Sequence, residues 1–78
     1  MSTDKEIKIN ARGLSSPGPR LMVETALKKG PFEKLRVVVS NQSAATDLEN
    51  YLKSLKALVE IDVIGEEFHI LAEFNPQK

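Results

Sequence analysis

Residues 14–20 read Leu14-Ser15-Ser16-Pro17-Gly18-Pro19-Arg20 and mark the passage from a strand to a helix. Proline suits the first helical position, because it has no N–H to satisfy and its φ already matches the helix. We therefore expect a helix over residues 17–29, with Pro17 at its first position and Ser16 as the N-cap. Gly30-Pro31 is a typical stop signal at its other end.

The first turn of this predicted helix has few N–H donors. Pro17 and Pro19 have none, so Gly18 and Arg20 are expected to point their N–H groups toward whatever precedes the helix. The helix dipole adds a partial positive charge at this position. Such a helix start favours a side-chain oxygen, a bound anion or a thiolate.

Apolar residues recur elsewhere with the period of a strand or of a helix. Ile7 and Ile9 share one face of the first strand, Asn41 is the expected N-cap of the second helix, and Gly65-Glu66 predicts a hairpin turn. The predicted elements are a strand over residues 6–10, a strand over 35–39, a helix over 42–56, and strands over 58–64 and 68–74.

The order β-α-β-α-β-β predicts a small α/β (α+β) sandwich with both helices on one face of a four-stranded sheet. Right-handed crossovers make the first three strands parallel, and the final hairpin makes the last one antiparallel. The residues expected to face the core are Met22, Val23, Ala26 and Leu27 on the first helix, Ala45, Leu48, Leu52 and Leu55 on the second, and Leu35, Val37, Val39, Val59, Ile61, Val63, Phe68, Ile70, Ala72 and Phe74 on the strands.

Composition narrows the function classes. The 78 residues predict a single domain, residues 1–78, and the absence of cysteine excludes disulfides and thiol chemistry in this chain. Eleven basic and eleven acidic residues give a formal net charge of zero, which argues against a nucleic-acid binder. We see no metal-ligand spacing and no cofactor motif. No apolar segment predicts a secretory signal or a membrane span, so a cytoplasmic location is the default expectation.

The run Asn10-Ala11-Arg12-Gly13-Leu14-Ser15-Ser16-Pro17-Gly18-Pro19 resembles the signature that opens TusA/SirA-like proteins. In that family a cysteine-proline-any-proline (CPxP) motif begins the first helix. The resemblance continues through Leu21-Met22-Val23 and Ala26-Leu27-Lys28-Lys29, and Ser40-Asn41-Gln42 is similar to the YedF branch. It covers residues 7–74 without a large insertion.

The resemblance implies a two-layer sandwich similar to the C-terminal domain of translation initiation factor three, with sheet order 1-2-4-3 and strand 4 antiparallel. It also implies a persulfide sulfur carrier. Such a sulfurtransferase-like protein accepts sulfur from a cysteine desulfurase or related enzyme and passes it to an acceptor for tRNA thiolation, cofactor synthesis or sulfur oxidation. The implied site is Ser16 at the cysteine position, surrounded by Arg12, Gly13, Pro17, Gly18, Pro19 and Arg20.

Ser16 is the one decisive departure from the family pattern. A hydroxyl cannot hold a persulfide, and the chain has no other cysteine to replace it. The chain as written is therefore expected not to transfer sulfur. Serine here is either an introduced replacement or the natural residue of a family member that has kept the fold as a non-catalytic protein-binding module. Arg12 and Arg20 either attract an anionic partner or are solvated surface residues.

Two other functions fit the sequence poorly. A serine hydrolase would need a base beside Ser16, and His69, the single histidine, is expected on the open sheet face, away from the helices. Nucleic-acid binding is suggested only by the likeness to a ribosome-binding domain, and few aromatic residues are present to support it.

Overall fold

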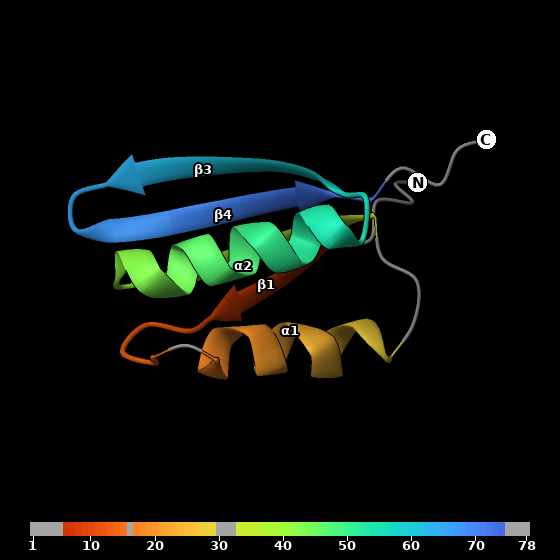
Figure 1. Ribbon diagram of the computed structural model, residues 1–78, viewed down its shortest axis with the longest axis horizontal. Coiled ribbons are helices and arrows are strands. Elements are labelled where there is room, and N and C mark those ends of the chain that lie inside the picture. Colours follow the sequence, from red (N-terminus) through yellow and green to blue (C-terminus); the bar gives the residue numbers. More distant parts are fainter. Residues whose placement is uncertain (1–5, 16, 30–32, 75–78) are drawn as a thin grey trace.

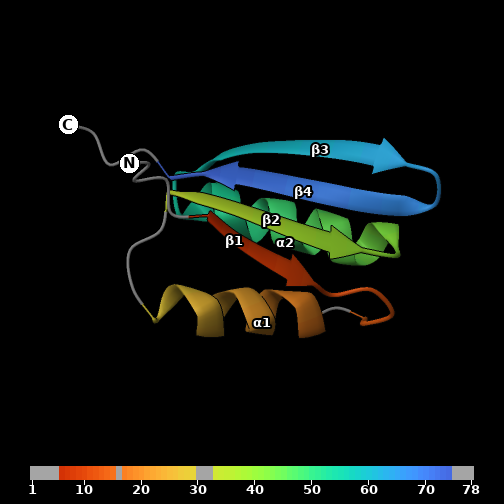
Figure 2. The same cartoon turned by 180° about the vertical axis from the view of Figure 1, so that it is seen from behind.

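The computed structural model describes residues 6–15, 17–29 and 33–74, which form one layer of helices packed on one sheet (Figure 1). α2 lies in front of the sheet in Figure 1 and behind it in Figure 2, where the opposite sheet face has no helix over it. The elements are β1 (Glu6–Asn10), α1 (Gly18–Leu27), β2 (Lys34–Val39), α2 (Gln42–Ser54), β3 (Leu58–Ile64) and β4 (Glu67–Glu73).

The sheet has the order β1-β2-β4-β3, which confirms the expected topology. β1 runs parallel to β2, whereas β4 runs antiparallel to both β2 and β3. The described strands thus leave β1 at one edge of the sheet and β3 at the other. Because β1 and β2 are parallel, the loops that follow them lie at the same end of the sheet.

The core lies between the sheet and the helices, as the alternating patterns predict, except that Val63 near the end of β3 is exposed rather than buried. Ile9, Val37, Ile70 and Ile61 are register partners in turn and form one row across the four strands. The buried apolar cluster comprises Ile9, Ala11, Val23, Leu35, Val37, Val39, Ala44, Ala45, Leu48, Leu52, Ala57, Ile70 and Ala72.

α2 begins as predicted. Asn41 is its N-cap, and its side-chain oxygen accepts a hydrogen bond from the Ala44 N–H at 2.8 Å. The helix ends at Ser54 rather than at residue 56, so Leu55 is the C-cap and not a core residue. Its side chain is exposed, and the expectation that Leu55 completes the buried stripe is wrong.

α1 is shorter than predicted, because it begins at Gly18 and ends at Leu27. Val23 is fully buried, but Met22 is 39% exposed and does not belong to the core. The reason is visible in Figures 1 and 2, where α1 lies beyond β1 on the side away from β2. Only one side of α1 therefore faces buried neighbours. The predicted stop at Gly30-Pro31 lies outside the described residues.

The sheet face without helices is less bare than expected. Val38 and His69 are register partners on this face. Val38 is only 8% exposed, and the His69 side chain is 15% exposed. The middle of this sheet face is therefore largely shielded from solvent. Ile64, at the end of β3, remains exposed.

Candidate functional site

The start of α1 differs from its prediction. Pro17 is the N-cap residue rather than the first helical residue, and it makes no side-chain cap hydrogen bond. Gly18 and Pro19 follow as the first two helical residues, and the Leu21 N–H donates to the Pro17 carbonyl at 3.0 Å. Ser16, the predicted N-cap and central site residue, lies outside the described residues.

The Gly18 N–H is not available in the way the sequence suggests. It donates to the Ser15 carbonyl at 2.7 Å, just before the helix. A ligand at this helix start would have to compete with that bond. The Gly18 N–H thus points to what precedes the helix, as expected, but its acceptor is the Ser15 carbonyl rather than a ligand.

The loop over residues 11–15 is fixed from both ends. Its first residue, Ala11, is buried and donates its N–H to the Val38 carbonyl at 2.9 Å. Gly13 has a φ of +81°, in the region that favours glycine, and its N–H donates to the Ser40 hydroxyl at 2.8 Å. The Asn41 side-chain N–H donates to the Leu14 carbonyl at 3.3 Å.

Asn41 therefore has two roles. Its oxygen caps α2, while its amide nitrogen holds the 11–15 loop. The loops after β1 and β2 meet here because parallel neighbours end at the same edge of the sheet. Sequence reasoning recognised Asn41 as a cap but missed its contact, and that of Ser40, with the 11–15 loop. The parallel order of the first two strands was the signal that could have paired these loops.

Arg12 extends from the same loop to the end of the sheet. Its Nε lies 2.6 Å from Oε2 of Glu67, and its Nη2 lies 3.1 Å from Oε1 of the same carboxylate. The hydrogen bond from Arg12 lowers the pKa of Glu67, and the same bond raises the pKa of Arg12. Sequence reasoning missed Glu67, because only the folded register brings it beside Arg12.

Arg20 joins the two helices. Its Nη1 lies 3.0 Å from Oε2 of Glu24 on α1, and its Nε lies 3.3 Å from Oδ2 of Asp47 on α2. Its guanidinium carbon also lies 5.9 Å from the centre of the Tyr51 ring. Burial raises the pKa of Tyr51, and nearby Glu24 raises it further. Both arginines of the predicted site thus already have carboxylate partners within the chain.

His69 lies on the open sheet face, as predicted, but it is largely covered. Its Nε2 is 3.4 Å from Oε1 of Glu67, yet neither ring nitrogen makes a hydrogen bond with a described residue. The Nε of Arg36 on the same face is also buried without a hydrogen-bond partner among the described residues. These three atoms are the buried side-chain nitrogen or oxygen atoms of the described residues that lack a hydrogen-bond partner.

The predicted site residues thus fall into two groups. Arg12, Gly13 and Pro17 are exposed at one end of the molecule, where a partner could reach them. Pro19 is fully buried, Gly18 is half-buried, and Arg20 is half-buried between the helices, so these three residues are less accessible to a partner. Among residues 6–15, 17–29 and 33–74, no three acidic or histidine side chains are grouped as metal ligands would be.

Neither described helix has the length and apolar character required to cross a bilayer. A comparison with curated proteins gives no match. Among solved structures, the chain is similar to the SirA-like protein from Desulfitobacterium hafniense, with a TM-score of 0.77 and 18% identity over 86% of this chain and 95% of that one. This likeness confirms the fold. The family model of the sulfurtransferase TusA matches residues 7–73. The chain therefore belongs to the TusA family, and membership of this family suggests a sulfur-carrier role with protein partners.

Proposed function

We propose that this chain is a sulfur-carrier-type protein whose docking surface surrounds the start of α1, and that with Ser16 it transfers no sulfur itself. One observation carries the proposal: a chain matched to the TusA family over residues 7–73 contains no cysteine. The proposed surface comprises Arg12, Gly13, Pro17, Gly18, Pro19 and Arg20. The proposal includes a cytoplasmic location, where a desulfurase and a sulfur acceptor would be its partners.

The chemistry of a carrier requires a thiolate at the site. The carrier thiolate attacks the outer sulfur of a donor persulfide, the donor S–S bond breaks, and the donor cysteine leaves as a thiolate. The carrier then holds the transferred sulfur in a new S–S bond. A serine hydroxyl is far less acidic than a thiol and forms no such bond, so Ser16 stops this reaction at its first step.

The described residues support a prepared site rather than a loose loop. Gly13, Leu14 and Arg12 are held by Ser40, Asn41 and Glu67, respectively. A loop fixed in this way loses little conformational entropy when a partner binds. The start of α1 would also favour the charged form of a thiolate placed near it. Both features fit a transfer site.

The direct test restores the missing atom. The Ser16→Cys variant is incubated with a cysteine desulfurase and free cysteine, and its intact mass is measured without reducing agent. We expect the mass to increase by one sulfur atom and to return to its starting value after reduction. Ser15→Cys is the matched control, because it places a thiol one residue away in the sequence, at an exposed position.

The control decides the meaning of the result. Sulfur added to the Ser16→Cys variant but not to Ser15→Cys supports a positioned carrier site. Equal loading of both variants would show only general thiol reactivity and would contradict the proposal. No loading of Ser16→Cys by any desulfurase tested would also count against it.

The alternative is a non-catalytic binding module of the same fold, and the absence of cysteine is the observation that favours it. In that case the chain with Ser16 binds its partner as tightly as the Ser16→Cys variant does. Arg12→Gln should then weaken capture, with Lys53→Gln on α2 as a remote control. Equal capture by the Arg12→Gln variant would exclude this surface. Arg20 is a poorer choice for this test, because its substitution also breaks a contact between the helices.

A further inference from the structure

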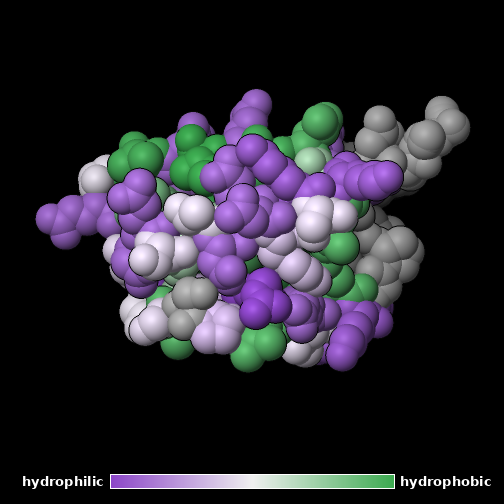
Figure 3. Space-filling view, in the orientation of Figure 1, coloured by the Kyte–Doolittle hydropathy of each residue, from purple (hydrophilic) through white to green (hydrophobic). Residues whose placement is uncertain are grey.

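The sheet edge at β1 is covered incompletely by the helix layer. α1 lies beyond β1 in Figures 1 and 2, so its outer side has no strand beneath it. Leu21 and Met22 on this side are 50% and 39% exposed. In Figure 3, hydrophobic residues appear along the corresponding edge as separate spots among hydrophilic ones. The helix layer therefore extends beyond the edge of the sheet on this side.

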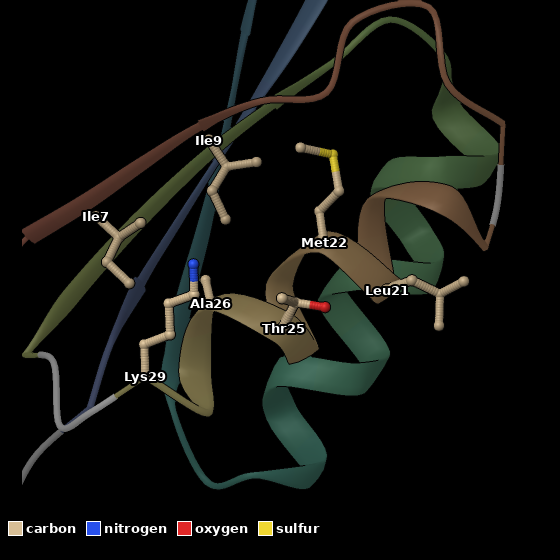
Figure 4. A pocket seen from close by; sticks show the side chains of 7 residues that line it. All are labelled: Ile7, Ile9, Leu21, Met22, Thr25, Ala26 and Lys29. Atoms are coloured by element: carbon tan, nitrogen blue, oxygen red, sulfur yellow. The ribbon is translucent and has the colours of Figure 1, made fainter.

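A groove lies between α1 and β1, with a volume of about 540 Å³. Clefts that bind ligands in proteins commonly measure about 300–1,000 Å³. In Figure 4, Met22 extends from α1 toward Ile9, and the amine of Lys29 lies at the other end of the groove. Lys29 is the one ionisable residue in the lining, which consists of Ile7, Ile9, Leu21, Met22, Thr25, Ala26 and Lys29.

The backbone beside this groove is also available. β1 pairs with β2 alone among the described strands, so alternate N–H and C=O groups of β1 face outward. An extended peptide can add to such an edge through backbone hydrogen bonds, while every second side chain enters an adjoining pocket. The free edge and the apolar groove are here parts of one surface, which we call the β1 flank.

We propose that the β1 flank binds an extended peptide segment of a partner protein in which apolar and acidic residues alternate. The peptide adds to the sheet beside β1 and under α1. Its apolar side chains fill the groove against Ile7, Ile9 and Met22. The inference does not depend on residue 16, and a failure of sulfur loading at that position would leave it untouched.

The positive charge of the chain beside β1 is the reason to expect acidic residues in the peptide. Side chains that do not enter the groove point to the open sheet face, where Lys8 is exposed. The register partner of Lys8 is Arg36, whose Nε has no hydrogen-bond partner among the described residues. Lys8 forms no ion pair with another described residue, so its amine is available to a carboxylate that points to the open sheet face.

The chain itself contains a segment of this pattern. β3 reads Val-Glu-Ile-Asp-Val over residues 59–63 and lies at the other free edge of the described sheet. Joining β3 of one copy to β1 of the next would be a head-to-tail contact, which extends into a filament or ring rather than closing a dimer. We therefore assign the β1 flank to a partner peptide, and self-association becomes an outcome of the test.

The experiment uses a fluorescein-labelled Val-Glu-Ile-Asp-Val peptide as the probe, with binding to the full chain followed by fluorescence anisotropy. The matched control peptide is Val-Lys-Ile-Lys-Val. A second control carries the acidic side chains but is N-methylated at alternate backbone nitrogens. We expect saturable binding of the acidic peptide, with at least threefold weaker binding of both controls, and slower amide exchange in β1.

Variants of the chain locate the site. Lys8→Glu should lower the affinity for the acidic peptide about three- to tenfold, which is the range expected when an exposed charge contact is reversed. Lys53→Glu on α2 should leave binding within twofold. Leu21→Gln removes apolar surface from the groove and should also weaken binding, and circular dichroism verifies that this exposed position leaves the fold intact.

Several outcomes would overturn the inference. Equal binding of the N-methylated peptide would exclude strand addition, and amide shifts confined to β3 would place the peptide at the other edge. Absence of saturable binding at millimolar peptide would exclude the site. Concentration-dependent association of the chain in sedimentation velocity, lost in Leu21→Gln, would assign the flank to a second copy instead of a partner peptide.

Discussion

Arg12 and Glu67 are 55 positions apart in the chain, yet they form a two-point ion pair with contacts of 2.6 and 3.1 Å. The pair connects the 11–15 loop before α1 to the first residue of β4. It holds the Arg12 guanidinium, a part of the proposed docking surface, in a defined orientation. An anionic partner that approaches Arg12 must therefore share or displace the Glu67 carboxylate.

The first prediction concerns the pKa of Glu67. Arg12→Gln removes the hydrogen bond and charge that lower this pKa, so the Glu67 pKa should rise toward its ordinary value. A depressed carboxyl pKa in the folded state stabilises the fold above the unfolded-state pKa, and this contribution is lost as the pH falls through the folded-state pKa. Any stabilisation from the pair is thus expected at neutral pH and not in acid.

Carboxyl carbon shifts in an NMR titration measure this effect directly. Lys53→Gln is the matched control, because Lys53 pairs with Glu49 on α2, and it should leave the Glu67 titration unchanged. A Glu67 titration that does not move in Arg12→Gln would show that the pair does not persist in solution.

The second prediction separates the two roles of Asn41. Asn41→Ala removes the cap of α2 and the bond to Leu14, and should lower the free energy of unfolding by about 0.5–2 kcal/mol. Asn41→Asp keeps an oxygen acceptor for the Ala44 N–H but loses the donor to Leu14. Asn41→Asp should therefore lower the free energy of unfolding in urea by less than Asn41→Ala does. Amide exchange in the 11–15 loop should nevertheless become faster. An Asp variant as unstable as the Ala variant would contradict this division.

The third prediction compares two leucines three residues apart. Leu52 is fully buried, whereas Leu55 is 41% exposed at the end of α2. Leu52→Ala should cost about 2–5 kcal/mol of unfolding free energy, because it removes buried methyl groups and leaves a cavity. Leu55→Ala should cost much less, since its side chain already contacts water. Urea unfolding of both variants checks the comparison, and equal losses would place Leu55 in the core after all.

The periodic patterns predicted the elements well, because each face of a strand or helix is set by neighbours in sequence. They failed at Met22, Leu55 and Val63, which have core spacing but exposed side chains. Met22 faces the flank where the sheet ends, and Leu55 follows the last turn of α2. Sequence spacing states which residues share a face, but it does not state where the opposing layer ends.

The resemblance around Pro17 and Pro19 located the candidate site in the sequence. It did not identify the residues that hold the 11–15 loop in place. Glu67 and Ser40 reach the 11–15 loop only through the pairing of strands that are distant in sequence. Their contacts depend on register and loop geometry, which a single sequence does not specify. The Gly18 N–H shows the same limit, since its acceptor is set by a local backbone turn.

The fourth prediction concerns Gly13. Its φ of +81° is costly for residues with a side chain, although an added Cβ would meet no atom within 4 Å. Gly13→Ala should therefore lower the unfolding free energy by about 1–2 kcal/mol through backbone strain rather than through a clash. Gly13→Asn should cost less, because asparagine tolerates this conformation better. Equal losses for both variants would show that the side chain itself, and not the backbone, disturbs the loop.

The fifth prediction is a stabilising substitution at the end of α2. Lys56 has a φ of +68°, and its N–H donates to the Lys53 carbonyl while the Ala57 N–H donates to the Leu52 carbonyl. This is the Schellman arrangement, in which glycine is preferred at the position of Lys56.

Relief of the left-handed conformation favours Lys56→Gly by about 1–2 kcal/mol. The greater freedom of glycine in the unfolded chain offsets about 0.4–1 kcal/mol of this gain. The net expectation is an increase of roughly 0.5–1 kcal/mol in the free energy of unfolding, measured in urea. Lys56→Ala is the control, because it removes the same side chain but keeps the strain. A gain in the Ala variant equal to that in the Gly variant would assign the effect to the lost lysine instead of the backbone.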